Sequence, residues 1–253
     1  MRTLWTAGDA QQTVMIKAFL PPPSPLMPHA SSSTANDSRF SHPFATLQEL
    51  ASDVLAFAKK QSVSACEVDI SDGFGQSVTV RCGEIETIEY NRDTSIAVTV
   101  YLGQHKGQAS TSVFSASALR ETVAAAINIA RFTAADPCSG LPDPERLAKN
   151  LHLQPDLDLY HPWLLSVEQA VEVAKRCEEA AFAVSSQISN SEGASVSIQE
   201  GQFVSANSLG FIGGFPTSRH YLSCAVIAGS GESMQRDDWY STARDPAAIE
   251  SAE

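Results

Sequence analysis

The six histidines are the first candidates for catalysis or metal binding, because histidine is a common catalytic base and the commonest metal ligand in proteins. They stand at positions 29, 42, 105, 152, 161 and 220. None of them belongs to a helical pair with an adjacent glutamate, which is the spacing that zinc peptidases use. The nearest pair, His152 and His161, lies in a proline-rich stretch without a glutamate at helical spacing. The histidines therefore predict no zinc site and no catalytic residues within this chain.

Other catalytic patterns are also missing from the sequence. There is no Gly-x-Ser-x-Gly elbow, and Gly73-Phe74-Gly75 lacks the further glycines of a phosphate-binding loop. The five cysteines form no pair with metal-ligand spacing. They stand at Cys66, Cys82, Cys138, Cys177 and Cys224. All except Cys138 fall at predicted strand or helix positions that are typical of small buried thiols, and a reducing cytoplasm is the simplest compartment for them.

One polar cluster is a candidate substrate-binding or partner-binding surface. Ser218, Arg219, His220 and Tyr221 lead into an apolar run that predicts a strand. In one interpretation the four residues form a cationic, hydrogen-bonding edge that contacts a peptide or a subunit. In the other they belong to an ordinary half-exposed strand, with Arg219 and Tyr221 opposite His220 and Leu222. The sequence leaves both interpretations open.

Composition narrows the class of partner. The chain has 253 residues, 43% of them hydrophobic, and a formal net charge of −12. Proteins that bind nucleic acid carry clustered Lys and Arg, whereas the basic residues here are scattered singly. No run of apolar residues reaches the 18 or so that a membrane span needs. We therefore expect a cytoplasmic protein that binds neither nucleic acid nor membrane.

The segment 75–111 has the pattern of an antiparallel meander, and the sheet that it forms is expected to position the candidate binding surface at 218–221. β-branched residues alternate along it, and turn-forming residues recur at 82–83, 91–93 and 102–104. Ile85 is out of phase with Ile88 and Tyr90, which predicts a β-bulge. A preceding strand at 65–71 ends in an Asp72-Gly73 turn, and further strands are expected at 194–199, 203–207 and 219–227.

Three helices are expected to cover the apolar face of this sheet. The first spans 46–60, with Thr46 and Glu49 as a capping box, and the second spans 117–132 after Ser115 or Ser117. The third begins at Ser166, with Gln169 completing a capping box. The predicted fold class is α+β: an antiparallel or mixed sheet covered by helices on one side, with a disordered N-terminal tail.

The proline distribution predicts five regions. They are a disordered tail (1–42), an N-terminal α/β half (43–132), a Pro-rich connector (133–165), a helix with a second β region (166–244) and the start of a further domain (245–253). Leu157, Leu159 and Trp163 are expected to pin the connector to the body. Asp245 and Pro246 begin a helix that stops after one turn, so the chain looks truncated there.

Four segments together resemble the PmbA/TldE branch of the TldD/PmbA metalloprotease family. They are VRCGEIETIEYNRDTSIAVTVYLGQHKGQAS, the junction from 130 to 138, DLDLYHP and PTSRHYLSC, and the resemblance covers about 46–250. It implies the N-terminal domain of a subunit that works as a heterodimer with a TldD-like subunit on peptides or unfolded proteins. It also places the zinc in the TldD-like partner, on a His-Glu-x-x-x-His helix, and no cofactor in this chain.

The residues also leave two alternatives to the function that the family resemblance implies. The first is a regulatory or adaptor module that binds another protein without any link to proteolysis. The second is a small hydrolase that uses His220 or His161. Restored peptide cleavage on partner binding would separate the family function from an adaptor.

Overall fold

The computed structural model describes residues 39–149 and 156–252. Six strands form one sheet in the order β3-β2-β1-β4-β5-β6, and all neighbouring pairs are antiparallel. The strands are β1 (Ala65–Arg81), β2 (Glu84–Leu102), β3 (His105–Thr111), β4 (Ile188–Asn207), β5 (Ile212–Ala228) and β6 (Gln235–Ala243). The helices are α1 (Phe44–Lys59), α2 (Ala116–Phe132) and α3 (Val167–Ala183), so the α+β prediction is confirmed.

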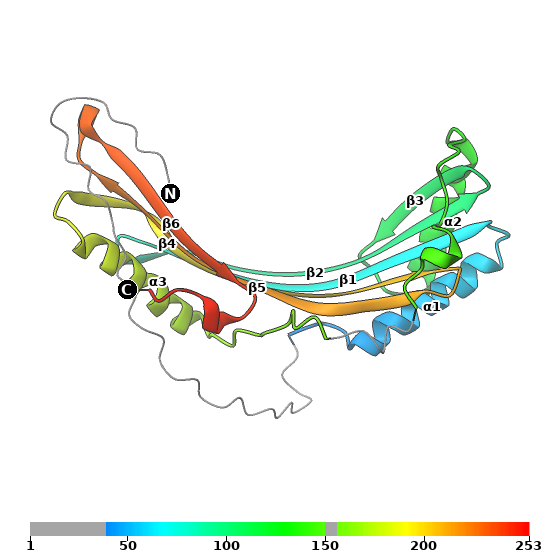
Figure 1. Ribbon diagram of the computed structural model, residues 1–253, viewed down its shortest axis with the longest axis horizontal. Coiled ribbons are helices and arrows are strands. Elements are labelled where there is room, and N and C mark those ends of the chain that lie inside the picture. The colour runs from blue at the N-terminus through cyan, green and yellow to red at the C-terminus, as the bar shows by residue number, and fades with distance from the viewer. Residues whose placement is uncertain (1–38, 150–155, 253) are drawn as a thin grey trace. The chain divides into compact units, whose positions relative to one another are not determined.

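All three helices cover the same face of the sheet, as predicted. Even-numbered residues of β1 share one face because strand side chains alternate. At one end of β1, Cys66, Val68 and Ile70 join an apolar cluster with α1 and α2. At the other end, Val78 and Val80 join a second cluster with α3. Figure 1 shows β1, β2, β4 and β5 passing between these helix-covered ends.

The two apolar clusters have different compositions. The α1–α2 cluster contains leucine and isoleucine side chains as well as valine and alanine, among them Leu47, Ile70, Ile96 and Leu119. The α3 cluster is built mainly on alanine and valine, and Trp163 packs against its margin. Leu119, Val123 and Ile127 are among the residues that α2 buries, whereas α3 buries Ala170, Val171, Ala174 and the polar Glu178.

The strands are longer than the sequence predicted. The expected turn at Asp72-Gly73 is wrong, because β1 continues through it with Gly73 opposite both Asp93 and Gly201. The expected turn at 91–93 is also wrong, because β2 continues through it. Gly201 lies between the two strands expected at 194–199 and 203–207, but in the structure it is inside the single strand β4. Hydrogen bonds to neighbouring strands, on both sides at Gly73 and Gly201 and to β1 at 91–93, override the local turn preference. The bulge is confirmed: the register shifts between Thr79 and Val80, with Val80 opposite Ile85.

Two of the three predicted helix starts are confirmed. Ser115 accepts a hydrogen bond from Ala118, and Ser166 with Gln169 forms a complete capping box. The Thr46 start is wrong: α1 begins at Phe44 after Pro43, and no side chain caps it. Asp245 caps a short 3-10 turn, Pro246–Ala248. Cys82 is also unlike its prediction, since it lies exposed in the turn between β1 and β2.

Three further features of the described residues bear on the sequence predictions. Residues 39–42, which were assigned to the tail, contact the sheet, while 1–38 lie outside the described residues. No helix in the described parts of the chain is long and apolar enough to cross a membrane. The 3-10 turn Pro144–Arg146 lies in the Pro-rich connector.

Gly107 of β3 is where α2 comes closest to the sheet. A Cβ atom at this position would lie 2.0 Å from the Ala126 carbonyl oxygen and 2.4 Å from the Ala130 nitrogen. Both atoms are helix backbone and cannot move as a flexible side chain would. Glycine at 107 therefore sets the distance between α2 and β3.

We expect Gly107→Ala to destabilise the fold by about 2 kcal/mol, because overpacking of this size forces the backbone apart. Urea unfolding measures the change. Gly201→Ala is the matched control, since nothing lies within 4 Å of a Cβ atom there. Equal stability of the two variants would contradict this account of the α2 contact.

Candidate functional site

A row of buried polar side chains crosses the helix-covered face between the two apolar clusters. Its members are Asp72, Gln76, Glu200, Gln202, Ser218 and His220, and none is more than 5% exposed. The strand register places Gln202 opposite Asp72 and Ser218 opposite Glu200. Buried polar groups cost free energy unless they are hydrogen-bonded. We call these six residues the polar row.

A first strap, residues 39–43, lies across one part of the polar row. The Asp72 carboxylate accepts a hydrogen bond from the His42 backbone N–H at 2.8 Å and faces the His42 ring at 3.3 Å. Gln202 donates to the His42 carbonyl at 2.6 Å. The Arg39 guanidinium lies 3.4 Å from Glu200 and 4.8 Å from the centre of the Phe74 ring. The buried carboxylates of the row thus bind the strap.

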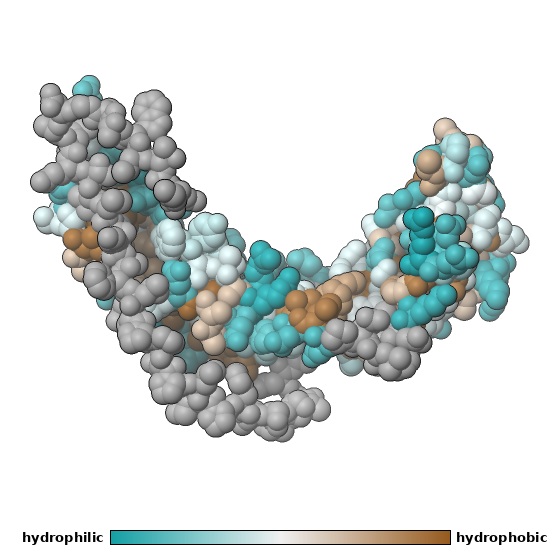
Figure 2. Space-filling view, viewed as in Figure 1, coloured by the Kyte–Doolittle hydropathy of each residue, from teal (hydrophilic) through white to brown (hydrophobic). Residues whose placement is uncertain are grey.

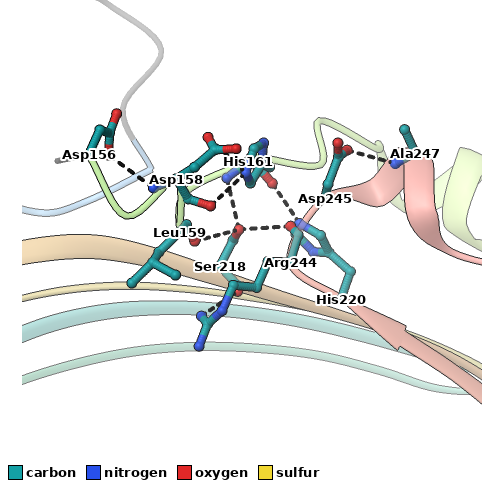
Figure 3. Close-up of polar contacts among 9 residues, drawn as sticks. All are labelled: Asp156, Asp158, Leu159, His161, Ser218, His220, Arg244, Asp245 and Ala247. Carbon is teal, nitrogen blue, oxygen red and sulfur yellow. Dashed lines mark hydrogen bonds and ion pairs between the residues drawn. The ribbon is translucent and has the colours of Figure 1, made fainter. Parts of the chain in front are cut away.

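A second strap, residues 156–165, covers the rest of the row. Ser218 accepts a hydrogen bond from the His161 N–H and donates to the Arg244 carbonyl, both at 2.9 Å. Its backbone N–H donates to the Leu159 carbonyl at 2.9 Å. Figure 3 shows Ser218 at the centre of these contacts, with His220 beside it. Residues from the strap and from the end of β6 therefore meet at one serine.

Glu200 links the two straps. Tyr160 of the second strap donates a hydrogen bond to this carboxylate at 2.9 Å, while Arg39 of the first strap pairs with its other oxygen. Burial and the neighbouring Glu200 charge raise the pKa of the Tyr160 hydroxyl well above its usual value. Tyr160 is therefore a hydrogen-bond donor throughout the physiological pH range.

His220 is fully buried beneath the second strap. Its Nε2 lies 2.7 Å from the His161 carbonyl, so this nitrogen carries the proton. Nδ1 has no hydrogen-bond partner among the described residues, and the Trp163 ring packs edge-on at 5.5 Å. Burial lowers the pKa of His220, against the opposing effect of its hydrogen bond to His161. The ring is held neutral as a structural donor.

The structure separates the four predicted site residues. Ser218 and His220 point into the covered face and bond to the second strap, whereas Arg219 and Tyr221 point to the opposite face. There the Tyr221 ring stacks on Tyr240 of β6 at 5.4 Å. The four therefore do not form one surface. Their role in binding substrate or partner stays a prediction.

The connector is held differently from its prediction. Trp163 does pack against the body, but Leu157 is 59% exposed, and the polar contacts of Tyr160 and His161 hold most of the strap. Apart from Ser218 and His220, sequence reasoning missed the polar row. Asp72 was assigned to a turn, although it is in phase with the apolar residues of β1, and that phase was the available signal.

A groove of about 810 Å³ lies beside the second strap and the first half of β5. It is lined by Gln48, Asp156, Leu157, Asp158, Leu159, Tyr160, Phe203, Ser205, Phe211, Ile212, Gly213, Gly214, Phe215 and Pro216. The Phe203 and Phe215 rings pack edge to face at 4.7 Å. β6 pairs only with residues 220–228 of β5, so no described strand pairs with this half of β5 on that side. We call this site the β5 groove.

The surface around the polar row is chemically mixed. Figure 2 shows polar and apolar side chains alternating over the strands between the two helix-covered ends. Within the described residues, no three His, Cys, Asp or Glu side chains are grouped so that they could hold a metal ion.

Comparison with known proteins identifies the family. The model of the PmbA/TldA metallopeptidase domain 1 matches residues 66–130, and that of the central domain matches 160–253. A curated relative, the metalloprotease PmbA of Escherichia coli O157:H7, is 42% identical over 78% of this chain. The chain belongs to the PmbA/TldE branch of the PmbA/TldD metallopeptidase family. It spans 43% of the length of the E. coli relative.

Solved structures show the same fold. A protein from Bacteroides thetaiotaomicron, described as a candidate modulator of DNA gyrase, matches 81% of this chain and 46% of its own with a TM-score of 0.74 at 23% identity. TldE from Thermococcus kodakarensis matches 79% of this chain and 44% of its own with a TM-score of 0.64 at 14% identity. The fold is thus one that PmbA/TldE proteins use.

We expect His220 to make the stability of this PmbA/TldE chain depend on pH. Because the folded state holds His220 neutral, the unfolded state takes up its proton first as pH falls below 6.5, the ordinary value. The stabilisation that arises from the lowered pKa of His220 is therefore fully present above pH 6.5 and is lost as the pH falls below that value. His220→Gln keeps a donor for the His161 carbonyl but cannot titrate.

Urea unfolding of both proteins at about pH 7.5 and about pH 5.5 measures the effect. The wild type should lose more stability on acidification than His220→Gln. Every other residue is the same in both proteins, so its contribution cancels in the comparison. Identical losses would rule out a depressed pKa at His220.

Proposed function

We propose that this chain is the N-terminal part of a PmbA/TldE-type subunit that holds peptide for a zinc centre in a TldD-like partner. The observation that carries the proposal is the β5 groove beside a half-strand that no described strand covers on that side. An extended peptide added to such an edge gains main-chain hydrogen bonds, which tolerate many sequences. Peptides and unfolded proteins are the corresponding substrates.

The lining of the groove defines the favoured peptide. Phe203 and Phe215 offer an aromatic surface, and the exposed Leu157 adds an aliphatic one. Asp156 and Asp158 add negative charge at the same margin. A peptide with apolar side chains next to basic ones would fit this groove, because its apolar groups would contact the aromatic and aliphatic lining and its basic groups the two aspartates. Arg219 and Tyr221, which lie on the same face of β5 as Phe215 and further along the strand, are the candidates for contact with the partner subunit.

The zinc of the system is proposed to belong to the TldD-like subunit. The grouping of metal-ligand side chains in the described residues does not fit a zinc ion, which takes three or four protein ligands. The role of this chain is to bind and orient the peptide. The alternative, an adaptor without a link to proteolysis, predicts partner binding that leaves peptide cleavage unchanged.

Peptide binding tests the groove directly. We expect Phe215→Ala to weaken the binding of a fluorescent unfolded peptide with apolar and basic residues by about tenfold, which is roughly 1.4 kcal/mol. Fluorescence anisotropy measures the affinity. Phe132→Ala is the control, because Phe132 is an aromatic side chain that is 90% exposed at the end of α2. Equal loss in both variants would count against the groove.

Cleavage with a partner tests the subunit role. We expect the purified chain to cleave no peptide by itself and to raise the cleavage rate of a zinc-loaded TldD-like subunit. Mass spectrometry of the peptide products and zinc analysis of each subunit are the measurements. Cleavage by this chain alone would overturn the non-catalytic role, and partner binding without a change in cleavage would favour the adaptor.

A further inference from the structure

The first strap is held largely through its main chain, as a peptide ligand is held. The Asp72 carboxylate accepts the His42 N–H at 2.8 Å, and the Gln202 side chain donates to the His42 carbonyl at 2.6 Å. We call Asp72 and Gln202 the main-chain clamp. Arg92 of β2 adds a hydrogen bond to the Arg39 carbonyl at 2.9 Å. Side chains of β1, β4 and β2 thus bind groups that every peptide carries.

Two side chains of the strap make contacts that depend on sequence. The Arg39 guanidinium pairs with the buried Glu200 carboxylate at 3.4 Å and lies over the Phe74 ring. The Phe40 ring packs against Tyr160 of the second strap, with 5.6 Å between the ring centres. The strap therefore carries a basic residue and then an aromatic one, three and two positions before the residue in the clamp.

The strap is an outer layer that is attached at one end. Among the described residues it continues only through Pro43 into α1, and Arg39 is the first of them. No residue of the strap is fully buried, whereas Asp72, Glu200 and Gln202 beneath it are. Its departure would therefore remove no helix, no strand and no apolar core.

We propose that the first strap occupies a binding site for an extended basic peptide, and that such a peptide replaces it. The buried carboxylates define the ligand, because a buried charge that loses its partner is strongly destabilising. A replacement must supply an N–H to Asp72, a carbonyl oxygen to Gln202 and a cation to Glu200. A peptide with Arg or Lys three positions before the clamped residue supplies all three groups.

The strap is then an internal competitor. While it fills the site, only the fraction of molecules with a released strap can bind the peptide, so the apparent affinity is lowered by that fraction. A ligand that matches the clamp and Glu200 overcomes this competition, whereas a peptide without a basic residue does not. The strap thus selects for basic extended peptides.

This site adjoins the β5 groove and differs from it in its residues. Tyr160 borders both sites, and Pro216 of the groove lies directly opposite Gln202 in the strand register. The clamp and Glu200 do not line the groove. The inference rests on the proposed function only for the class of ligand, a peptide. Either site can therefore fail its own test while the other passes.

Hydrogen–deuterium exchange of the full chain measures release of the strap. The probe is the sequence of residues 39–44 as a free peptide, Arg-Phe-Ser-His-Pro-Phe, blocked at both ends. Without the probe, the His42 N–H should exchange slowly, because it donates to a buried carboxylate. Saturation with the probe should speed this exchange by about tenfold or more.

A modified probe is the matched ligand control. A methyl group on the main-chain nitrogen of its histidine removes the N–H that Asp72 accepts and keeps every side chain. This probe should leave the exchange of the His42 amide unchanged. Release of the strap by both probes alike would overturn the main-chain clamp.

Arg39→Ala tests the competition. The variant loses the cation that holds the strap to Glu200 and keeps the clamp, so it should bind the unmodified probe about fivefold more tightly than the wild type. Arg146→Ala is the matched control, because the Arg146 side chain is 80% exposed and pairs with the exposed Asp143. It should bind the probe as the wild type does. Equal affinities in all three proteins would overturn the competition.

Phe215→Ala separates this site from the β5 groove. Because Phe215 lines the groove and does not contact the strap, the probe should still release the strap in this variant. Loss of that release would assign the probe to the groove and overturn the proposal. Probe binding that leaves the His42 amide protected in the wild type would overturn it as well.

Discussion

A carboxylate buried in a sheet must be met by hydrogen-bond donors, and the rest of this structure depends on that constraint. Asp72 and Glu200 lie on β1 and β4 at the middle of the helix-covered face, and both are buried. Their donors come from segments without helix or strand structure, through His42, Arg39 and Tyr160. Charge burial without such partners costs several kcal/mol. The straps are therefore part of the core although they have no regular structure.

The need for hydrogen-bond partners explains why the middle of this sheet face carries polar residues, whereas its two ends carry apolar residues that pack against helices. Helices pack through apolar stripes, as α1 and α2 do at one end and α3 at the other. Between them the sheet instead offers polar side chains, to which irregular backbone can bind. The β5 groove opens at the margin of that region, where the second strap meets the half of β5 with which β6 does not pair. Tyr160 joins the two, because it lines the groove and donates a hydrogen bond to Glu200 of the polar row.

The sequence predicted well what depends on near neighbours. The capping box joins Ser166 to Gln169 only three positions away, and the bulge at Ile85 follows from a break in strand alternation. The missed features depend on distant partners. Arg39 and Glu200 are 161 positions apart, and the strands extend through Asp72 and Gly201 because neighbouring strands pair on both sides. Local turn preference contains no information about those neighbours.

The separation of the two apolar clusters has a consequence for cooperativity. No buried apolar side chain of one cluster belongs to the other, so the two ends are joined through strand backbone and the polar row. Proteins open locally in units that follow such boundaries. The α3 end, whose cluster is smaller and contains only one leucine among alanines and valines, can then open as a foldon of its own while the α1–α2 end stays closed. A chain built in this way can adapt one end to a ligand without unfolding the other.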